Sequence, residues 1–116
     1  MQTGSLELMT KVPEEKDLYI LTEFFKMLGN PARIHILLLL MEQETKVSSL
    51  AEQLGMTQSA VSHQLNLLKS NKLVKRRRDG KMIFYTLVDD HVRLVMKKGM
   101  EHILERGGHT EFVWYP

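Results

Sequence analysis

The chain contains no cysteine, which excludes disulfide bonds, thiolate metal sites and thiol-based redox sensing. It also lacks a long hydrophobic run, because the longest, residues 36–41, is far too short to cross a bilayer. The N-terminal segment has no charged-then-apolar signal pattern, and there are no repeats or low-complexity linkers. With 43% hydrophobic residues in a chain of 116, the sequence predicts one globular, cytoplasmic domain without a membrane partner.

The net charge of +2 conceals an uneven distribution. Residues 1–60 carry eight acids and five bases, whereas residues 69–81 carry seven bases and one acid. A concentrated basic segment is typical of proteins that bind a phosphate backbone, although a basic face that only meets solvent is commoner. The elements predicted around this segment decide between the two interpretations.

Apolar residues at helical spacing predict four helices before the basic segment. The first is capped by Asp17 and runs to residue 28, and the second covers residues 32–41, with Pro31 in its first turn. Ser48 or Ser49 caps a short helix that ends at residues 54–55. Thr57 caps a longer helix that reaches about residue 71.

The last two of these helices are joined by a tight turn at residues 55–56, which predicts a helix-turn-helix whose second helix enters the DNA major groove. Short or planar hydrogen-bonding side chains begin that second helix: Gln58, Ser59, Ser62, His63 and Gln64. An ordinary polar helix face has the same composition. These residues nevertheless lie at the end of the helix where base contacts are usually made.

Residues 73–78 and 81–87 are predicted to form two strands, joined by a hairpin turn at Asp79-Gly80. A helix-turn-helix followed by a basic hairpin predicts a winged helix, mainly α with a β-hairpin wing. The wing's basic side chains would supply phosphate contacts, and hence affinity and salt dependence more than base specificity: Arg76, Arg77, Arg78 and Lys81.

Four potential metal ligands follow the wing: Asp89, His91, His102 and Glu105. His91 and His102 are 11 residues apart, which is three helical turns, so both lie on one helix face. Three turns rise roughly 16 Å, whereas zinc holds its ligands within about 2.3 Å. One helix therefore cannot close the site, but an antiparallel copy of it can. The spacing indicates metal sites shared across a dimer, and a solvated polar face is the alternative.

Three segments resemble the ArsR/SmtB family of metal-responsive repressors, over residues 24–105. They are Phe25–Ile34 (FKMLGNPARI), Ser59–Leu65 (SAVSHQL) with the exit that follows it, and the pattern D-x-H, ten residues, H-x2-E from Asp89 to Glu105. The resemblance implies a homodimer with antiparallel terminal helices. It also implies that Asp89 and His91 of one subunit and His102 and Glu105 of the other bind zinc tetrahedrally, with cobalt as a substitute and nickel less suitable.

In this family, the metal-free dimer binds an inverted-repeat operator in double-stranded DNA and represses transcription. Metal binding releases the dimer and induces genes of metal efflux and homeostasis. The resemblance also suggests an allosteric relay from His102, through a carbonyl near Lys72, to Gln58. An enzyme is not expected, because no second chemical constellation accompanies the four ligands.

Other interpretations stay open. One is a winged-helix regulator or protein-interaction module that responds to a non-metal signal, and another is a nickel or cobalt sensor with His109 as an additional ligand. We expect His35 to be a partly buried structural histidine. The expected organisation is an N-terminal extension (residues 1–16), a winged-helix DNA-binding and dimerisation domain (17–106) and a C-terminal tail (107–116).

Overall fold

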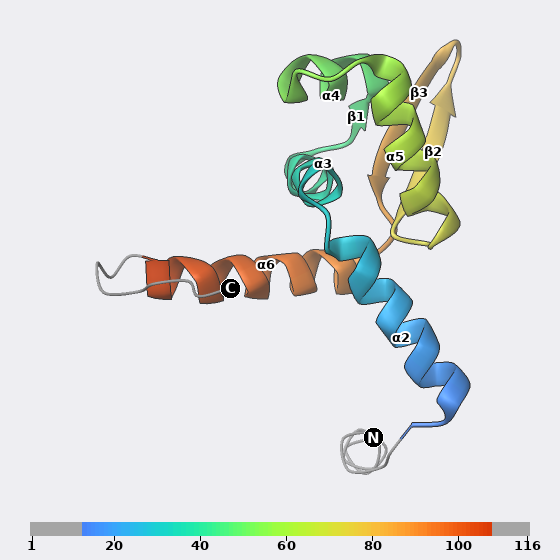
Figure 1. Cartoon of the computed structure of the whole chain (residues 1–116). Helices are drawn as coiled ribbons and strands as arrows, with labels where there is room; N and C mark the ends of the chain where they lie inside the picture. The colour runs from blue at the N-terminus through green and yellow to red at the C-terminus, as the bar shows by residue number, and fades with distance from the viewer. Residues whose placement is uncertain (1–12, 108–116) are drawn as a thin grey trace.

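The computed structural model of the protein describes residues 13–107. Their elements are α2 (Glu15–Leu28), α3 (Pro31–Glu42), β1 (Thr45–Lys46), α4 (Val47–Leu54), α5 (Gln58–Ser70), β2 (Val74–Asp79), β3 (Met82–Leu87) and α6 (Asp90–Gly107). Figure 1 shows α3, α4, α5 and the strands gathered in one body, from which α6 projects. The predicted winged helix is confirmed: α4 and α5 form the helix-turn-helix, and β2 and β3 form the wing.

The sheet has a third strand that the sequence interpretation missed. Its order is β1-β3-β2, and β1 pairs antiparallel with β3 through Thr45 opposite Tyr85 and Lys46 opposite Phe84. A two-residue strand shows no alternation of polar and apolar residues, so the polar residues 42–46 give no sign of it in the sequence. The strand matters because it ties the base of the wing to the body.

Two predicted helix caps are wrong. Helix α2 begins at Glu15, so Asp17 lies inside its first turn, where its charge still complements the helix dipole. Helix α4 begins directly after β1 with Lys46 at its N-cap position, which leaves Ser48 and Ser49 inside the helix. Lys46 has an extended backbone because it pairs in β1, and its side chain makes no capping hydrogen bond. The Thr57 cap of α5 is confirmed, since its hydroxyl accepts from the backbone N–H of Ala60 at 3.1 Å.

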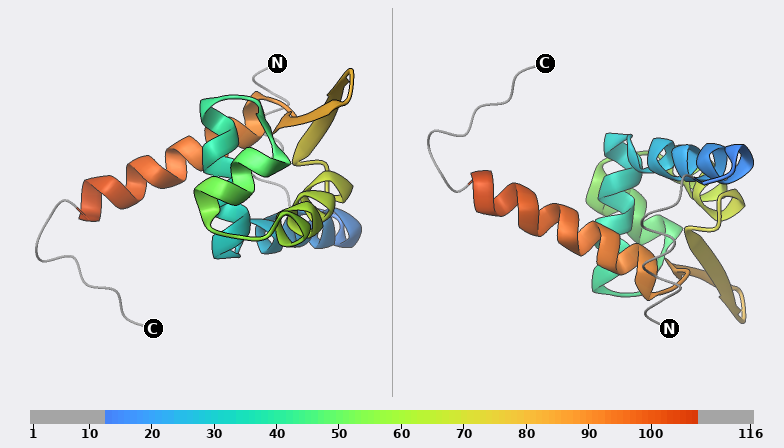
Figure 2. Two further views of the ribbon diagram at one scale, coloured as in Figure 1. Left: turned by 90° about the horizontal axis from the view of Figure 1, so that it is seen from above. Right: turned by 90° about the horizontal axis from the view of Figure 1, so that it is seen from below.

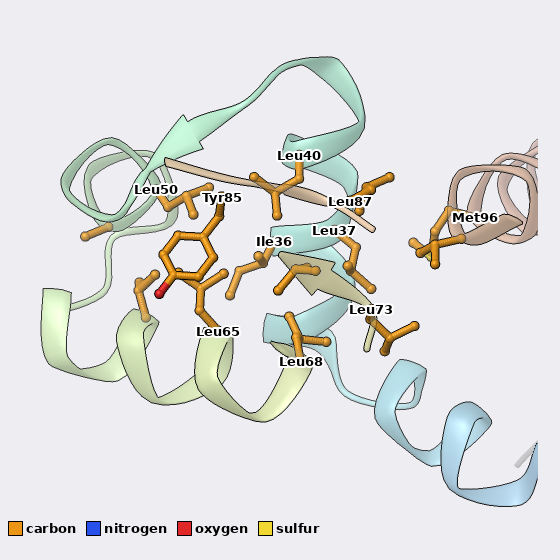
Figure 3. Close-up of a cluster of buried hydrophobic side chains, with 14 residues drawn as sticks. Ile36, Leu37, Leu40, Leu50, Leu65, Leu68, Leu73, Tyr85, Leu87 and Met96 are labelled. Atoms are coloured by element: carbon orange, nitrogen blue, oxygen red, sulfur yellow. The ribbon is translucent and has the colours of Figure 1, made fainter. Parts of the chain in front are cut away.

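The core lies between α3, α5 and the sheet (Figure 3). Helical spacing predicts that Val61, Leu65 and Leu68 of α5 face inward, and this is confirmed because all three are fully buried. On α3, helical spacing predicts an apolar face of Ile34, Leu37, Leu38 and Met41, yet Ile36 and Leu40 are buried as well. The reason is that α3 contacts α2, α4, α5, α6 and β3, so more than one of its faces is covered. His35, expected to be partly buried, is exposed.

Helix α2 buries none of its residues fully in this chain. Much of the apolar face that helical spacing predicts is exposed, with Leu18 and Leu21 at 50% and Phe25 at 55%. The other two residues of that predicted face, Phe24 and Leu28, are partly buried. Among the described residues, no single helix is long and apolar enough to cross a membrane, although α2 and α3, bent by 85°, have the combined length and composition. Much of α3's apolar surface is accounted for by the core.

Gly55 sets the turn between α4 and α5. Its φ of 65° lies in the left-handed region, and the N–H of Met56 closes the helix end by donating to the carbonyl of Ala51 at 3.0 Å. Nothing lies within 4 Å of a Cβ built there, so a side chain would meet strain and no clash.

Replacing Gly55 by Ala should lower the free energy of unfolding by about 1 kcal/mol, because an L side chain is disfavoured in the left-handed region. Gly55→Asn is the matched control and should lose less, since asparagine tolerates this conformation. Urea unfolding at one fixed protein concentration measures both. Equal losses for the two variants would contradict the backbone explanation.

Candidate DNA interface and metal-binding residues

The N-terminal end of α5 presents the side chains predicted to face DNA. Gln58, Ser59 and His63 are exposed, and Ser62 is partly buried. Gln64 differs from the others, because it is partly buried and its side-chain oxygen accepts a hydrogen bond from Arg33 Nη1 at 3.2 Å. Within residues 13–107, the other four predicted side chains make no hydrogen bond to a side chain of another helix or strand.

Arg33, which the sequence interpretation did not single out, anchors α5 to the junction of α2 and α3. Its Nε donates to the carbonyl of Met27 at 2.8 Å and its Nη2 to that of Lys26 at 3.4 Å. Its position in the first turn of α3, beside the Asn30 cap, aims it back at these carbonyls. Arg33 therefore fixes how the DNA-reading helix sits on the helices that precede it.

The wing's arginines do not all face the same way. Arg76 lies opposite Tyr85 and Arg78 opposite Ile83, whereas Arg77 lies opposite Phe84 on the other face of the hairpin. All three are exposed, as is Lys81 in the turn. The turn itself is shifted by one residue from the predicted Asp79-Gly80, since Asp79 belongs to β2 and pairs with Met82.

Arg77 has an internal partner. Its Nε and Nη2 donate to the two carboxylate oxygens of Glu44 at 2.9 and 2.7 Å, and its guanidinium carbon lies 5.1 Å from the centre of the Phe84 ring. The donation from Arg77 lowers the pKa of Glu44 below its usual value, so the pair is charged at neutral pH. The prediction that treated Arg77 as equivalent to its neighbours missed this, because Glu44 lies 33 residues away in sequence.

Asp89 and His91 lie together at the start of α6. One Asp89 carboxylate oxygen, Oδ1, accepts from the backbone N–H groups of His91 at 2.9 Å and Val92 at 3.2 Å, which caps the helix. These donors, Val92 first and His91 after it, lower the pKa of Asp89 below its usual value. The second oxygen, Oδ2, lies 3.6 Å from His91 Nδ1, and the His91 side chain is 94% exposed.

This pair fits one half of a zinc site. Two ligand atoms held about 2.0–2.1 Å from a tetrahedral zinc ion lie roughly 3.3 Å apart. The separation of 3.6 Å between Asp89 Oδ2 and His91 Nδ1 is close to that value. Because capping uses only Oδ1, Oδ2 remains available as a ligand. Deprotonated carboxylate and imidazole are also the oxygen and nitrogen donors that zinc accepts.

The other two candidate ligands, His102 and Glu105, are exposed near the far end of α6. They lie on the same continuous helix as His91, so roughly 16 Å of helix rise separates the two histidines. Within the described part of the chain, no three histidine, aspartate or glutamate side chains come together to hold a metal ion. His109 lies outside the described residues.

The proposed relay residues are not brought together within one chain. Lys72 follows α5 in the left-handed conformation, φ 62°, and the N–H of Leu73 closes the helix end on the carbonyl of Leu68 at 2.9 Å. Figures 1 and 2 place this loop far from the C-terminal half of α6, which carries His102. Gln58 lies at the opposite end of α5 from Lys72. A path from His102 to Gln58 therefore needs a second chain.

The family described as "bacterial regulatory protein, arsR family" matches residues 30–76, from the start of α3 into the wing. The nodulation protein NolR of Rhizobium meliloti is 37% identical over 90 residues, which cover 76% of this chain and 74% of NolR. The chain belongs to the arsR family of bacterial regulatory proteins. At the level of the family it is a transcriptional regulator with a DNA-binding winged helix.

Two further relatives support the assignment. The transcriptional repressor SmtB homolog of Synechocystis is 40% identical over 85 residues, covering 73% of this chain and 64% of that relative, slightly less than two thirds of its length. The homodimeric winged helix-turn-helix DNA-binding domain of Mb0332 from Mycobacterium bovis has a TM-score of 0.73 and 27% identity, and covers 90% of this chain and 99% of that domain.

Asp89 caps α6, and its predicted role as a metal ligand can be separated from this cap by mutation. Asp89→Ala removes the oxygen that caps α6, and we expect a lower urea unfolding midpoint with chelator present. Asp89→Asn keeps a capping oxygen and should retain most of the wild-type midpoint. A midpoint for Asp89→Ala equal to that of the wild type would show that this cap adds no stability.

Proposed function

We propose that the protein is a zinc-responsive transcriptional repressor that binds its operator as a metal-free homodimer and is released when zinc binds between the two α6 helices. The observation that carries the proposal is the arrangement of α6. A preformed carboxylate–imidazole pair, Asp89 and His91, lies at its start, and a second pair, His102 and Glu105, is exposed three turns on. Release would induce genes of metal efflux and homeostasis, as in the metal-responsive repressors that the chain resembles.

The two incomplete halves complement each other. An antiparallel pair of α6 helices brings Asp89 and His91 of one chain beside His102 and Glu105 of the other, and symmetry repeats the arrangement. The result is a closed site with four oxygen and nitrogen ligands, which suits zinc, and cobalt as a substitute. The metal would act here as a regulatory ligand that holds two helices in a fixed relation.

The exposed apolar surface supports the homodimer. Helices α2 and α6 carry ten of the exposed large hydrophobic side chains of the described residues: Leu18, Tyr19, Ile20, Leu21 and Phe25 on α2, and Leu94, Val95, Met100, Ile103 and Leu104 on α6. An apolar hollow also opens between the end of α2, α3 and α6, lined by Leu28, Ile34 and Met100 among others. Exposed apolar side chains in this number are typical of an interface, and their burial by a second chain would stabilise the dimer.

In this proposal, α5 inserts Gln58, Ser59, Ser62 and His63 into the major groove, while Arg76, Arg78 and Lys81 of the wing contact phosphates. Gln64 would contribute less directly, because Arg33 already holds its side-chain oxygen. Two α5 helices in a symmetric dimer read the two halves of an inverted repeat, so affinity depends on their separation and angle.

Coupling then acts through dimer geometry. Since His102 and the Lys72 loop are far apart in one chain, any relay from His102 to Lys72 and Gln58 has to cross to the partner chain. When four ligands from two chains bind one metal ion, they fix how the two α6 helices lie relative to each other. This in turn sets the spacing of the two α5 helices. A coupling free energy of about 1–3 kcal/mol is ordinary for such linked sites.

A regulator with a non-metal signal is the second candidate, favoured by the 37% identity to a nodulation protein whose name implies no metal. On this account the exposed histidines of α6 are solvated side chains. Nickel or cobalt with His109 as an extra ligand is a variant of the first proposal.

Fluorescence anisotropy on duplex DNA from upstream of the protein's own gene tests the function. The metal-free protein should bind, zinc should weaken binding about 5–150-fold, and chelator should restore it. Cobalt should act similarly. DNA binding that is indifferent to zinc, cobalt and nickel would reject the metal proposal in favour of the non-metal regulator. Absence of DNA binding at modest salt would favour a protein-interaction module.

His102→Gln sharpens this test. The variant should bind DNA as the wild type does without metal, yet need at least about tenfold more zinc for release, since even an outer-shell partner is worth about 10–100-fold in metal affinity. His35→Gln is the matched control, because it removes another exposed histidine, from α3, and should behave as wild type. Normal zinc release in His102→Gln would remove His102 from the ligand set.

A further inference from the structure

The geometry points to Arg77 as a positioning residue: its ion pair with Glu44 holds the wing in the orientation that DNA binding requires, and Arg77 is not itself a phosphate contact. This inference rests on the proposed DNA-binding function. It separates Arg77 from Arg76 and Arg78, with which it forms a continuous basic run in the sequence.

The pair crosses the whole sheet. Lys46 of β1, Phe84 of β3 and Arg77 of β2 lie in register across the three strands. From this row Arg77 passes over the Phe84 ring, 5.1 Å from its centre, and reaches Glu44, which precedes β1. Arg77 therefore joins β2 directly to the segment before β1, although the two strands are not neighbours.

The outer part of the wing has little else to hold it. In β2 only Val74 is buried, and every residue from Lys75 to Asp79 is exposed. Among the described residues, the Arg77–Glu44 pair supplies the side-chain hydrogen bonds that connect β2 or β3 with the rest of the fold. The wing is otherwise positioned by its own pairing, by the two-residue strand β1 and by the core residues at its base.

The charges also argue against a phosphate contact. One edge of the Arg77 guanidinium is committed, because Nε and Nη2 both donate to Glu44. Nη1 lies 3.9 Å from Asp79, which adds a second acid near the guanidinium without a hydrogen bond. A phosphate would have to displace a carboxylate held by two charge-assisted bonds. Neither Arg76 nor Arg78 has an acidic partner among the described residues, and both lie on the opposite hairpin face.

Glu44→Gln decides between the two roles, because they predict opposite signs. If Arg77 contacts a phosphate and Glu44 only competes for it, removing this acid should leave DNA affinity unchanged or raise it. If the pair positions the wing, Glu44→Gln should weaken binding about three- to fivefold at fixed salt. The matched control is Glu42→Gln, which removes an exposed acid two residues away that forms no ion pair with any of residues 13–107 and should not weaken binding.

Arg77 variants complete the cycle. Arg77→Lys keeps the charge but loses the two-pronged geometry, so it should weaken binding as much as Glu44→Gln, and the double variant should be no worse than either single one. Retained affinity in Arg77→Lys together with unchanged or tighter binding by Glu44→Gln would overturn the proposal. Arg78→Gln should weaken binding and reduce the salt slope by about one, which tests separately whether the wing meets phosphates.

Hydrogen exchange of the wing amides, measured without DNA, tests the positioning itself. Amides of β2 should exchange faster in Glu44→Gln than in Glu42→Gln, because the outer wing has lost its connection to the body. Equal exchange in the two variants would overturn the proposal even if the protein binds DNA. If wild-type protein bound no DNA while the exchange difference appeared, the proposed function would fail and the structural role of the pair would stand.

Discussion

Side chains three turns apart on one straight helix stay roughly 16 Å apart, and no rotamer change closes that gap. Helix α6 imposes this constraint on the protein, since it carries an acid and a histidine at each end of the Asp89–Glu105 interval and projects from the body without bending back. A metal that bridges such groups must take half of its ligands from another molecule. In our account, the homodimer is thus a requirement of the metal site as well as a means of reading a symmetric operator.

The position of α6 also connects the proposed metal site with the proposed DNA-binding surface. The start of α6 follows the last strand of the wing directly, and Asp89, which ends that connection, both caps the helix and offers its second oxygen as a ligand. Helix α3 contacts both α6 and α5, so the helix with the proposed metal ligands and the helix proposed to read DNA share one core. A change in how two α6 helices pair would move two nearly rigid winged helices relative to each other, which is the kind of motion that dimer interfaces undergo in switching proteins.

Much of this fold could be predicted because its signals are local. Thr57 caps α5, Gly55 ends α4, and the inward residues of α5 follow helical spacing. The failures involve distant contacts. The strand β1 is too short to show a pattern, α3 is covered on several faces, and Arg77 meets Glu44 only after the sheet forms. The candidate ligands were found from spacing, yet their assembly could not be read from one chain, since the site as proposed exists only between two. The cap made by Asp89 and the side-chain contact of Arg33 with Gln64 likewise needed the structure.

The central claim is that each metal site draws its ligands from two chains, and mixed dimers test it most directly. One variant carries Asp89→Asn with His91→Gln, and the other carries His102→Gln with Glu105→Gln. Differently tagged chains allow the mixed dimer to be purified and its zinc content measured by chelator competition. The account predicts that neither variant homodimer binds zinc tightly, and that the mixed dimer regains one tight site, built from the intact half of each chain. Tight binding by either homodimer, or none by the mixed dimer, would contradict a site shared between subunits.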